Sequence, residues 1–326
     1  MFPASRLTDL HLCPAFSGPA PHLGGPISTP GHATTLIGSL IAARGTDQAT
    51  CAMGPPDFIV TGAGTCLIGG QPAARMLEKA MHGGVVIWGC FTVLIGGPSA
   101  GVTLGNPAAG TAACEAARLG RNPPPGTTYP SGPLAGQQIP SQTAGQSYNN
   151  CGVEASRQII NHVNAGSGNP PVSQETLLNQ SMANNDAEQV PGNMYASGGT
   201  FPDDRVNILS NNGVPAHTES PTSGNMEQAV AEGRGVEVSL QAGTLWPVSS
   251  PGSQGTPGQP GYIPPGSGAH IVLVTGLQYD ADGNLQNVII NDTGTGQCGI
   301  PVPAATFQQA VDQRGMDHTV TDNPIW

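Results

Sequence analysis

A cysteine, a histidine and a carboxylate follow one another in the C-terminal half of the chain in an order that suits nucleophilic catalysis. Cys151 comes directly after Asn149 and Asn150 in the stretch NNCGVEASRQII. Asparagine is a favoured N-cap, and apolar residues then recur at helical spacing, so the pattern predicts an amphipathic helix with Cys151 in its first turn. The N-terminus of a helix carries partial positive charge, which favours thiolate over thiol and makes a cysteine there a good nucleophile.

A thiolate nucleophile needs a base, and His270 is the best candidate in this half. It opens AHIVLVTGLQYD, which predicts a β-strand; DADGN then predicts a hairpin loop, and NVIINDTG predicts a second strand ending in Asn291 and Asp292. A loop of three residues (281–283) or of five puts Asp292 on the face of His270, whereas a two-residue loop puts Asn291 there. We expect Asp292 to orient His270 and keep Asn291 as the alternative.

The same order of residues resembles the papain-like cysteine peptidases, in particular their bacteriocin-processing branch. Gln146, five residues before Cys151, could donate an N–H to a developing oxyanion, as a glutamine just upstream of the cysteine does in that superfamily. The resemblance implies an α+β fold for residues 142–326 and peptide-bond cleavage by Cys151, with His270 as base and Asp292 as orienting group. The Pro- and Gly-rich stretch 247–268, which leads into His270, predicts a lid or substrate groove, with an irregular insertion as the alternative.

The first hundred residues contain a repeat that gathers possible metal ligands. The segments TLIG, CLIG and VLIG start three similar stretches, and GSLIAARGTDQATC aligns with GGQPAARMLEKAMH so that Cys51 matches His82. HLGGPI and HGGVVI match as well, which adds His22. Three short β units packed about a pseudo-threefold axis would bring these side chains together, and a tetrahedral zinc needs about four such ligands. His11 is the expected fourth ligand, with Cys13 as its rival.

These motifs resemble the PAAR-repeat family over residues 1–97. QPAAR, LIAAR, DLHLCP and CAMGPPDFIVTGAGTCLIGG carry the resemblance; Glu78 stands where the other aligned repeat has Asp47. The resemblance implies a mainly β, zinc-bound cone of short β-hairpins that caps the trimeric spike of the type VI secretion machine and carries a fused effector.

Composition limits the other possibilities. Residues 142–326 contain four basic and sixteen acidic side chains, so this half would repel nucleic acid. No stretch is long and apolar enough for stable membrane insertion, and MFPASRLTDL lacks the pattern of a secretory signal. We therefore expect synthesis and folding in the bacterial cytoplasm, where the seven cysteines would be ligands, catalytic groups or core thiols rather than disulfides. Cys114, in particular, is expected to be a small apolar contact.

The sequence as a whole predicts a type VI secretion effector in three parts. Residues 1–97 form the zinc-binding tip, residues 98–141 a Gly- and Pro-rich linker with at most a short helix near 110–120, and residues 142–326 a cysteine protease toxin. Its expected partners are the trimeric spike, a protein substrate in the recipient cell and a cognate immunity protein. The alternatives are deamidation, transglutamination or cell-wall peptide cleavage by the same triad, or a non-catalytic tip whose C-terminal half binds cargo.

Overall fold

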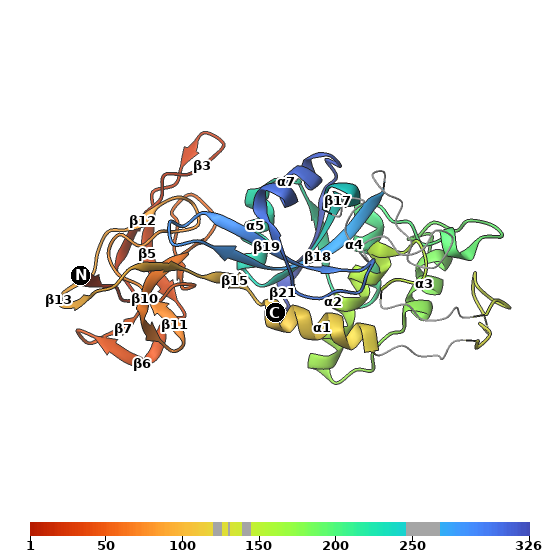
Figure 1. Cartoon of the computed structure of the whole chain (residues 1–326), viewed down its shortest axis with the longest axis horizontal. Coiled ribbons are helices and arrows are strands. Elements are labelled where there is room, and N and C mark those ends of the chain that lie inside the picture. Colours follow the sequence, from red (N-terminus) through yellow and green to blue (C-terminus); the bar gives the residue numbers. More distant parts are fainter. Residues whose placement is uncertain (120–125, 130, 139–144, 246–267) are drawn as a thin grey trace. The chain divides into compact units, whose positions relative to one another are not determined.

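The computed structural model describes residues 1–119, 126–129, 131–138, 145–245 and 268–326, and these divide into two units (Figure 1). The first unit comprises Met1–Leu104 together with Leu277–Asn287, and the second comprises Gly105–Gly276 together with Val288–Trp326. The stretch predicted to form a lid, residues 247–268, lies outside the described residues except for Gly268.

Three β-hairpins within Met1–Leu104 share one local pattern. In each, a longer strand pairs antiparallel with a short strand that ends in alanine. The strand pairs are β6 (His32–Ile37) with β7 (Leu40–Ala42), β10 (Thr61–Ile68) with β11 (Gln71–Ala73), and β13 (Cys90–Ile95) with β1 (Phe2–Ala4). The first strand of the chain therefore completes the last hairpin, which closes the repeat on itself.

The backbone joins the three hairpins in a closed ring of hydrogen bonds just after the short strands. The amide of Ser5 donates to the carbonyl of Ala74, that of Ala74 to Ala43, and that of Ala43 to Ser5, each at 3.0 Å. The next residue in each repeat is an arginine that pairs with an acid three positions later, in Arg6–Asp9, Arg44–Asp47 and Arg75–Glu78. The predicted pseudo-threefold arrangement is thus present in both backbone and side chains.

The other strands of Met1–Leu104 connect the repeats. One sheet has the order β12-β2-β5-β8-β9, with bounds β2 (Leu10–Leu12), β5 (Gly25–Thr29), β8 (Gln48–Ala49), β9 (Asp57–Phe58) and β12 (Val85–Val86). A small hairpin consists of β3 (Phe16–Ser17) and β4 (Ala20–Pro21), and β14 (Ser99–Gly101) pairs with β10. Small side chains let these short strands approach closely, and the core between them contains Ile27, Ala43, Ala49, Ile59, Ala74 and Val86.

The second unit is organised around an antiparallel sheet of order β16-β21-β17-β18-β19-β20. The bounds are β16 (Ala216–Glu219), β17 (Arg234–Gln241), β18 (Ala269–Tyr279), β19 (Leu285–Asp292), β20 (Ile300–Pro303) and β21 (His318–Pro324). The amide of Asp280 donates to the carbonyl of Asn284 at 2.9 Å, so residue 280 pairs with residue 284 and the β18–β19 loop holds three residues, one of the alternatives that the sequence left open. This register places Asp292, at the end of β19, on the same side of the hairpin as His270.

Helices, several of which pack against this sheet, complete the second unit (Figure 1). They are α1 (Pro107–Leu119), α2 (Cys151–Ser167), α3 (Gln174–Ala183), the 3₁₀ turn η1 (Met194–Ala196), α4 (Pro202–Asn211), α5 (Ser223–Ala231), α6 (Ala242–Leu245) and α7 (Ala304–Asp312). The apolar residues of α2 that the sequence pattern singled out are buried: Val153, Ile159 and Ile160 pack with Leu177 of α3 and Leu273 of β18 in one core. The fold class is the predicted one, mainly β hairpins followed by an α+β region.

The first part of the predicted linker is ordered secondary structure. Strands β14 and β15 (Thr103–Gly105) and helix α1 occupy most of residues 99–119. Val102 and Leu104 are buried, as is the alanine-rich face of α1 with Ala113 and Ala117. Helix α1 lies where the sequence allowed a short helix, whereas β14 and β15 were not expected because Val102 and Leu104 are isolated apolar residues in a Gly- and Pro-rich stretch.

Candidate active site and candidate metal site

Cys151 is the first residue of α2, as the capping pattern predicted. Its N-cap residue, Asn150, makes no side-chain bond to the helix and donates from Nδ2 to Oε1 of Gln174 instead, at 3.1 Å. Cys151 therefore lies at the N-terminus of α2, where the partial positive charge of the helix favours a thiolate. The Cys151 side chain is partly exposed and lines a cavity of 840 Å³, so a nucleophile at this position is reachable.

The thiol, the imidazole and a carboxylate form a chain of hydrogen bonds. Nε2 of His270 lies 2.7 Å from Oδ1 of Asp292, and both side chains are almost completely buried. The His270 ring also hydrogen-bonds to Cys151. Because Nε2 faces Asp292, Nδ1 is the ring atom left for the sulfur. The three residues lie at the start of α2, near the start of β18 and at the end of β19.

Asp292 is held by the turn that follows it. The amides of Gly294 and Thr295 donate to its two carboxylate oxygens at 2.9 and 3.0 Å, and the Thr295 hydroxyl donates to Oδ2. Burial would raise the pKa of Asp292, but the hydrogen bond and charge of His270, together with Thr295, outweigh burial and lower it. Asp292 is thus kept ionised and oriented toward the imidazole.

Cys151 and His270 each stabilise the charged form of the other. Burial alone would raise the pKa of Cys151, but the hydrogen bond and charge of His270 outweigh it and lower that pKa. Burial likewise opposes a charged imidazole, yet Asp292 and Cys151 raise the pKa of His270 to about 10. The arrangement therefore favours a thiolate beside an imidazolium, the reactive form of a cysteine nucleophile.

The two other amides considered for the site form hydrogen bonds with other groups. Asn291, the alternative orienting residue, donates from Nδ2 to Gly110 O and to Gln158 Oε1, at 2.8 and 2.9 Å. Gln146 is buried and donates from Nε2 to the carbonyl of Tyr148 at 3.1 Å. The structure thus brings Asp292 rather than Asn291 to His270, and the oxyanion role of Gln146 stays a prediction.

The cavity beside Cys151 has an apolar wall and charged groups. Apolar contacts come from Met182, Phe201 and Ile271, and the charged side chains are Glu188, Asp204 and Arg314. A pocket of this size, lined by polar and apolar residues in similar measure, suits an extended peptide segment or a side chain of one.

A buried ion pair next to the nucleophile was missed from the sequence. Arg205 of α4 lies 3.0 Å from Glu237 of β17, and both side chains are fully buried. Glu237 accepts from the hydroxyl of Ser156 on α2 at 2.8 Å, and Arg205 donates to Ser239, whose side chain is in the cavity wall with Cys151. Against burial, which raises the pKa of Cys151, the charge of Arg205 also lowers it, as a smaller cause than His270 and the Ile271 amide. The available signal was Glu237 itself, a charge within the apolar strand GVEVSL.

In the first unit, four side chains form a candidate metal site. Ligand atoms of Cys13, His22, Cys51 and His82 all lie within 4.8 Å of one another. Cys13 Sγ is 3.5 Å from His22 Nδ1 and 3.6 Å from His82 Nδ1. A tetrahedral zinc with bonds of about 2.0–2.3 Å separates its ligand atoms by roughly 3.6 Å, so these residues fit that metal. Ser17 Oγ lies 2.7 Å from Nε2 of His22, which would hold the ring with Nδ1 toward the ion.

The structure corrects one predicted ligand: Cys13 joins this group and His11 does not. His11 directs Nδ1 at the carbonyl of Gly25, 2.9 Å away, and Nε2 at Asp57, 3.2 Å away. His11 lies in β2 and Cys13 is the first residue after it; both are buried while Leu12 between them is exposed. Two residues of extended chain span about 6.6 Å, so only one of the two side chains reaches the group. His11 lies against Asp57 instead.

A third copy of the repeat would have identified Cys13. The segment ASRLTDLHLC aligns with AARGTDQATC and AARMLEKAMH, so that Cys13, Cys51 and His82 occupy the same position. Thr8, Thr46 and Leu77 also share a position and all have positive φ, at 76°, 80° and 73°. His11 aligns with Ala49 and Ala80, which line the repeat interior.

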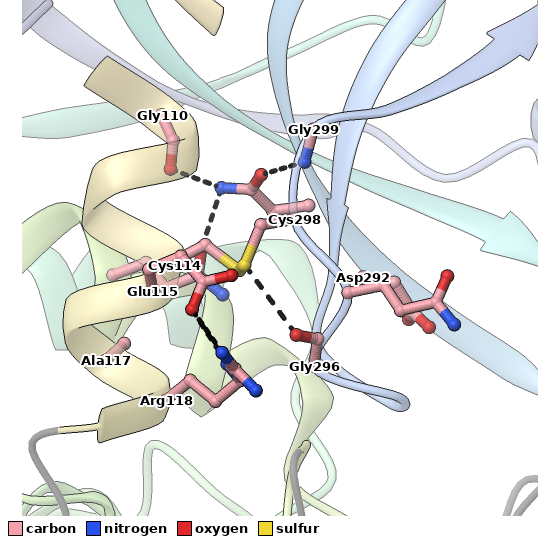
Figure 2. The surroundings of a disulfide bond; sticks show 12 residues. Gly110, Cys114, Glu115, Ala117, Arg118, Asp292, Gly296, Cys298 and Gly299 are labelled. Carbon is pink, nitrogen blue, oxygen red and sulfur yellow. Dashed lines mark hydrogen bonds and ion pairs between the residues drawn. A yellow bond between two sulfur atoms is a disulfide. The ribbon is translucent and has the colours of Figure 1, made fainter. Parts of the chain in front are cut away.

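Two cysteines that were expected to be reduced are joined. Cys114 of α1 and Cys298, in the segment between β19 and β20, form a disulfide with Cα atoms 5.8 Å apart (Figure 2). The expectation of free thiols rested on a cytoplasmic chain, and the identification of Cys114 as a mere apolar contact was wrong. Its partner lies 184 residues away, beyond any local pattern.

Comparison with known proteins gave a family match and a structural match, which are similarities only. The family model described as the PAAR motif matches residues 17–88. Among solved structures, a protein described as a C39-like peptidase from Bacillus anthracis matches at 17% identity and a TM-score of 0.38, over 54% of this chain and 90% of that one. A comparison with the curated proteins gave no match. None of the helices among the described residues has the length and apolar character needed to cross a membrane.

Proposed function

We propose that this chain is a type VI secretion effector in which a zinc-binding PAAR tip delivers a cysteine peptidase. The observation that carries the enzymatic part is the hydrogen-bonded series Cys151, His270 and Asp292 at the edge of a cavity. The PAAR motif at residues 17–88 supports the delivery part.

The chemistry follows from the charges at the site. The Cys151 thiolate attacks a peptide carbonyl, and the first-turn amides of α2, with Gln146 as a predicted further donor, stabilise the oxyanion. The His270 imidazolium gives its proton to the leaving amine, then takes one from the water that hydrolyses the acyl-enzyme. Asp292 keeps the His270 ring oriented and stabilises its positive charge throughout the reaction.

The tip would bind zinc through Cys13, His22, Cys51 and His82, and the ion would link three repeats that each have little core of their own. Leu36, Leu67 and Leu94 stand at matching positions of the three repeats, and 51–62% of each is exposed. A pseudo-threefold set of exposed leucines suits a trimeric partner, which we propose is the spike protein. Replacing all three by serine should abolish co-purification with that trimer while the zinc content stays unchanged.

We further propose that the substrate is a protein of the recipient cell and that the producing cell makes a cognate immunity protein. The proposed delivery through the type VI secretion machine follows from the proposed role of residues 1–97 as its PAAR tip. The acidic balance of residues 142–326 favours partners with basic surfaces.

The test compares the full chain with its Cys151→Ala variant in a lysate of susceptible cells, followed by N-terminal proteomics. A peptidase produces new N-termini that the variant does not. Conversion of glutamine to glutamate, or glutamine-linked crosslinks, without new N-termini would instead indicate deamidation or transglutamination by the same residues. Identical proteomes would overturn the enzymatic proposal and leave the cargo-binding alternative.

A further inference from the structure

The disulfide of the second unit lies close along the chain to the orienting carboxylate. Cys298 is six residues after Asp292, in the segment that connects β19 to β20, and it joins this segment to Cys114 in the middle of α1 (Figure 2). No residue of the catalytic series belongs to α1, so the bond ties the segment after Asp292 to an element outside that series.

The tied segment is the same one that holds Asp292. Gly294 and Thr295 donate their amides to the carboxylate, and the main chain of Asp292 closes the turn by accepting from Gly296 and donating to Gln297, at 3.0 and 2.9 Å. The position of the carboxylate therefore depends on the conformation of residues 293–297, and Cys298 anchors the end of that stretch.

The side chain of Asn291 also links this part of the chain to α1, by hydrogen bonds alone. Asn291 donates from Nδ2 to the carbonyl of Gly110 at 2.8 Å and accepts from the amide of Gly299 at 3.1 Å. These bonds hold the two ends of the segment near α1, but each can exchange with water. The disulfide is the covalent part of the attachment.

We propose that the Cys114–Cys298 pair is a redox modification site that controls the peptidase: oxidation fixes the 293–299 segment on α1 with Asp292 directed at His270, and reduction releases it. This inference rests on the proposed function. It implies that the enzyme has low activity in the reducing cytoplasm of the cell that makes it and gains activity in an oxidising compartment.

The redox step is a thiol–disulfide exchange with a small or protein disulfide, such as oxidised glutathione. Cys298, which is partly exposed, attacks one sulfur of the oxidant as thiolate and releases the first thiol. Cys114, buried on α1, then attacks the mixed disulfide at Cys298 and releases the second thiol. Two protein thiols and one disulfide become one protein disulfide and two thiols, and the oxidant takes up the two electrons and the two protons.

The experiment measures the rate at which iodoacetamide alkylates Cys151 in the full chain at about pH 6, by peptide mass spectrometry. The chain is first equilibrated with oxidised or reduced glutathione. We expect the reduced chain to react about tenfold more slowly, because raising the pKa of Cys151 by about one lowers its thiolate fraction about tenfold. Cys114→Ser/Cys298→Ser should show the slow rate under both conditions. Cys66→Ser, a matched loss of a free cysteine in the first unit, should respond like the natural chain.

Repeating the comparison of oxidised and reduced chain in the Asp292→Asn variant separates an effect that acts through the carboxylate from a general loosening of the fold. If the disulfide acts through Asp292, reduction should have little further effect in Asp292→Asn. A full tenfold effect in that background, or equal rates for the oxidised and reduced natural chain, would overturn the proposal. A fast, redox-sensitive Cys151 in a chain that cleaves no protein would instead refute the proposed peptidase and leave the redox control intact.

Discussion

Nε2 of His270 lies 2.7 Å from Oδ1 of Asp292, at the ends of two neighbouring strands joined by a three-residue loop. The short loop sets the register, and the register sets which of two adjacent side chains, Asn291 or Asp292, meets the imidazole. Asn291 instead binds Gly110 and Gln158. The contact between His270 and Asp292 is therefore a direct consequence of loop length.

Replacing Asp292 by asparagine should lower kcat on a labelled protein substrate by about 10²–10⁴-fold and leave a measurable rate, because the ring loses its charge partner while the nucleophile remains. Cys151→Ala should leave no rate. Asp312→Asn, which changes an exposed carboxylate of the same unit, serves as the control and should match the natural chain. Equal rates for Asp292→Asn and the control would remove Asp292 from the site.

The reactivity of Cys151 should depend on pH in a way set by His270. The pKa of Cys151 is lowered by the imidazolium, so iodoacetamide should still alkylate it rapidly at mildly acidic pH, where ordinary thiols are protonated. Peptidase activity should fall again as pH rises through the pKa of His270, about 10, because the leaving amine loses its proton donor. In His270→Asn the acid limb of the alkylation profile should move up toward the ordinary thiol range. An unmoved limb would mean that His270 does not set the thiolate.

The pair Arg205 and Glu237 should behave as a buried ion pair that supports α2. Arg205→Met leaves the Glu237 charge buried without its partner and should cost about 3–5 kcal/mol of local stability. Arg205→Met/Glu237→Leu removes both charges and should cost much less. Hydrogen exchange of β17 peptides measures both, and a double variant as unstable as the single one would contradict this account.

Zinc binding should distinguish Cys13 from His11. Elemental analysis of the purified full chain is expected to find about one zinc per chain. Cys13→Ala removes one of four ligands and should reduce the zinc content sharply, whereas His11→Gln should keep it, because His11 bonds to Gly25 and Asp57 instead of the ion. The reverse result would restore His11 as the ligand.

Features encoded over short stretches were predictable from the sequence. The N-cap pattern placed Cys151 at the start of α2, and the hairpin signal placed His270 and the pair Asn291 and Asp292 on adjacent strands, while the loop length was left open between two, three and five residues. The repeat likewise indicated His22, Cys51 and His82 as neighbours. Each of these inferences needs only the period of a helix or strand and the geometry of a turn, which a few neighbouring residues determine.

Contacts between distant segments were decided by the tertiary structure alone. The pairing of Cys114 with Cys298 and of Arg205 with Glu237, and the closure of the repeats by β1 on β13, join residues whose own surroundings in the sequence carry no sign of the partner. The choice between Cys13 and His11 is different, because the third copy of the repeat already aligns Cys13 with Cys51 and His82, and the structure adds that His11 lies against Asp57 instead. Local patterns specify which way a side chain points, but which distant group it meets depends on how the whole chain packs.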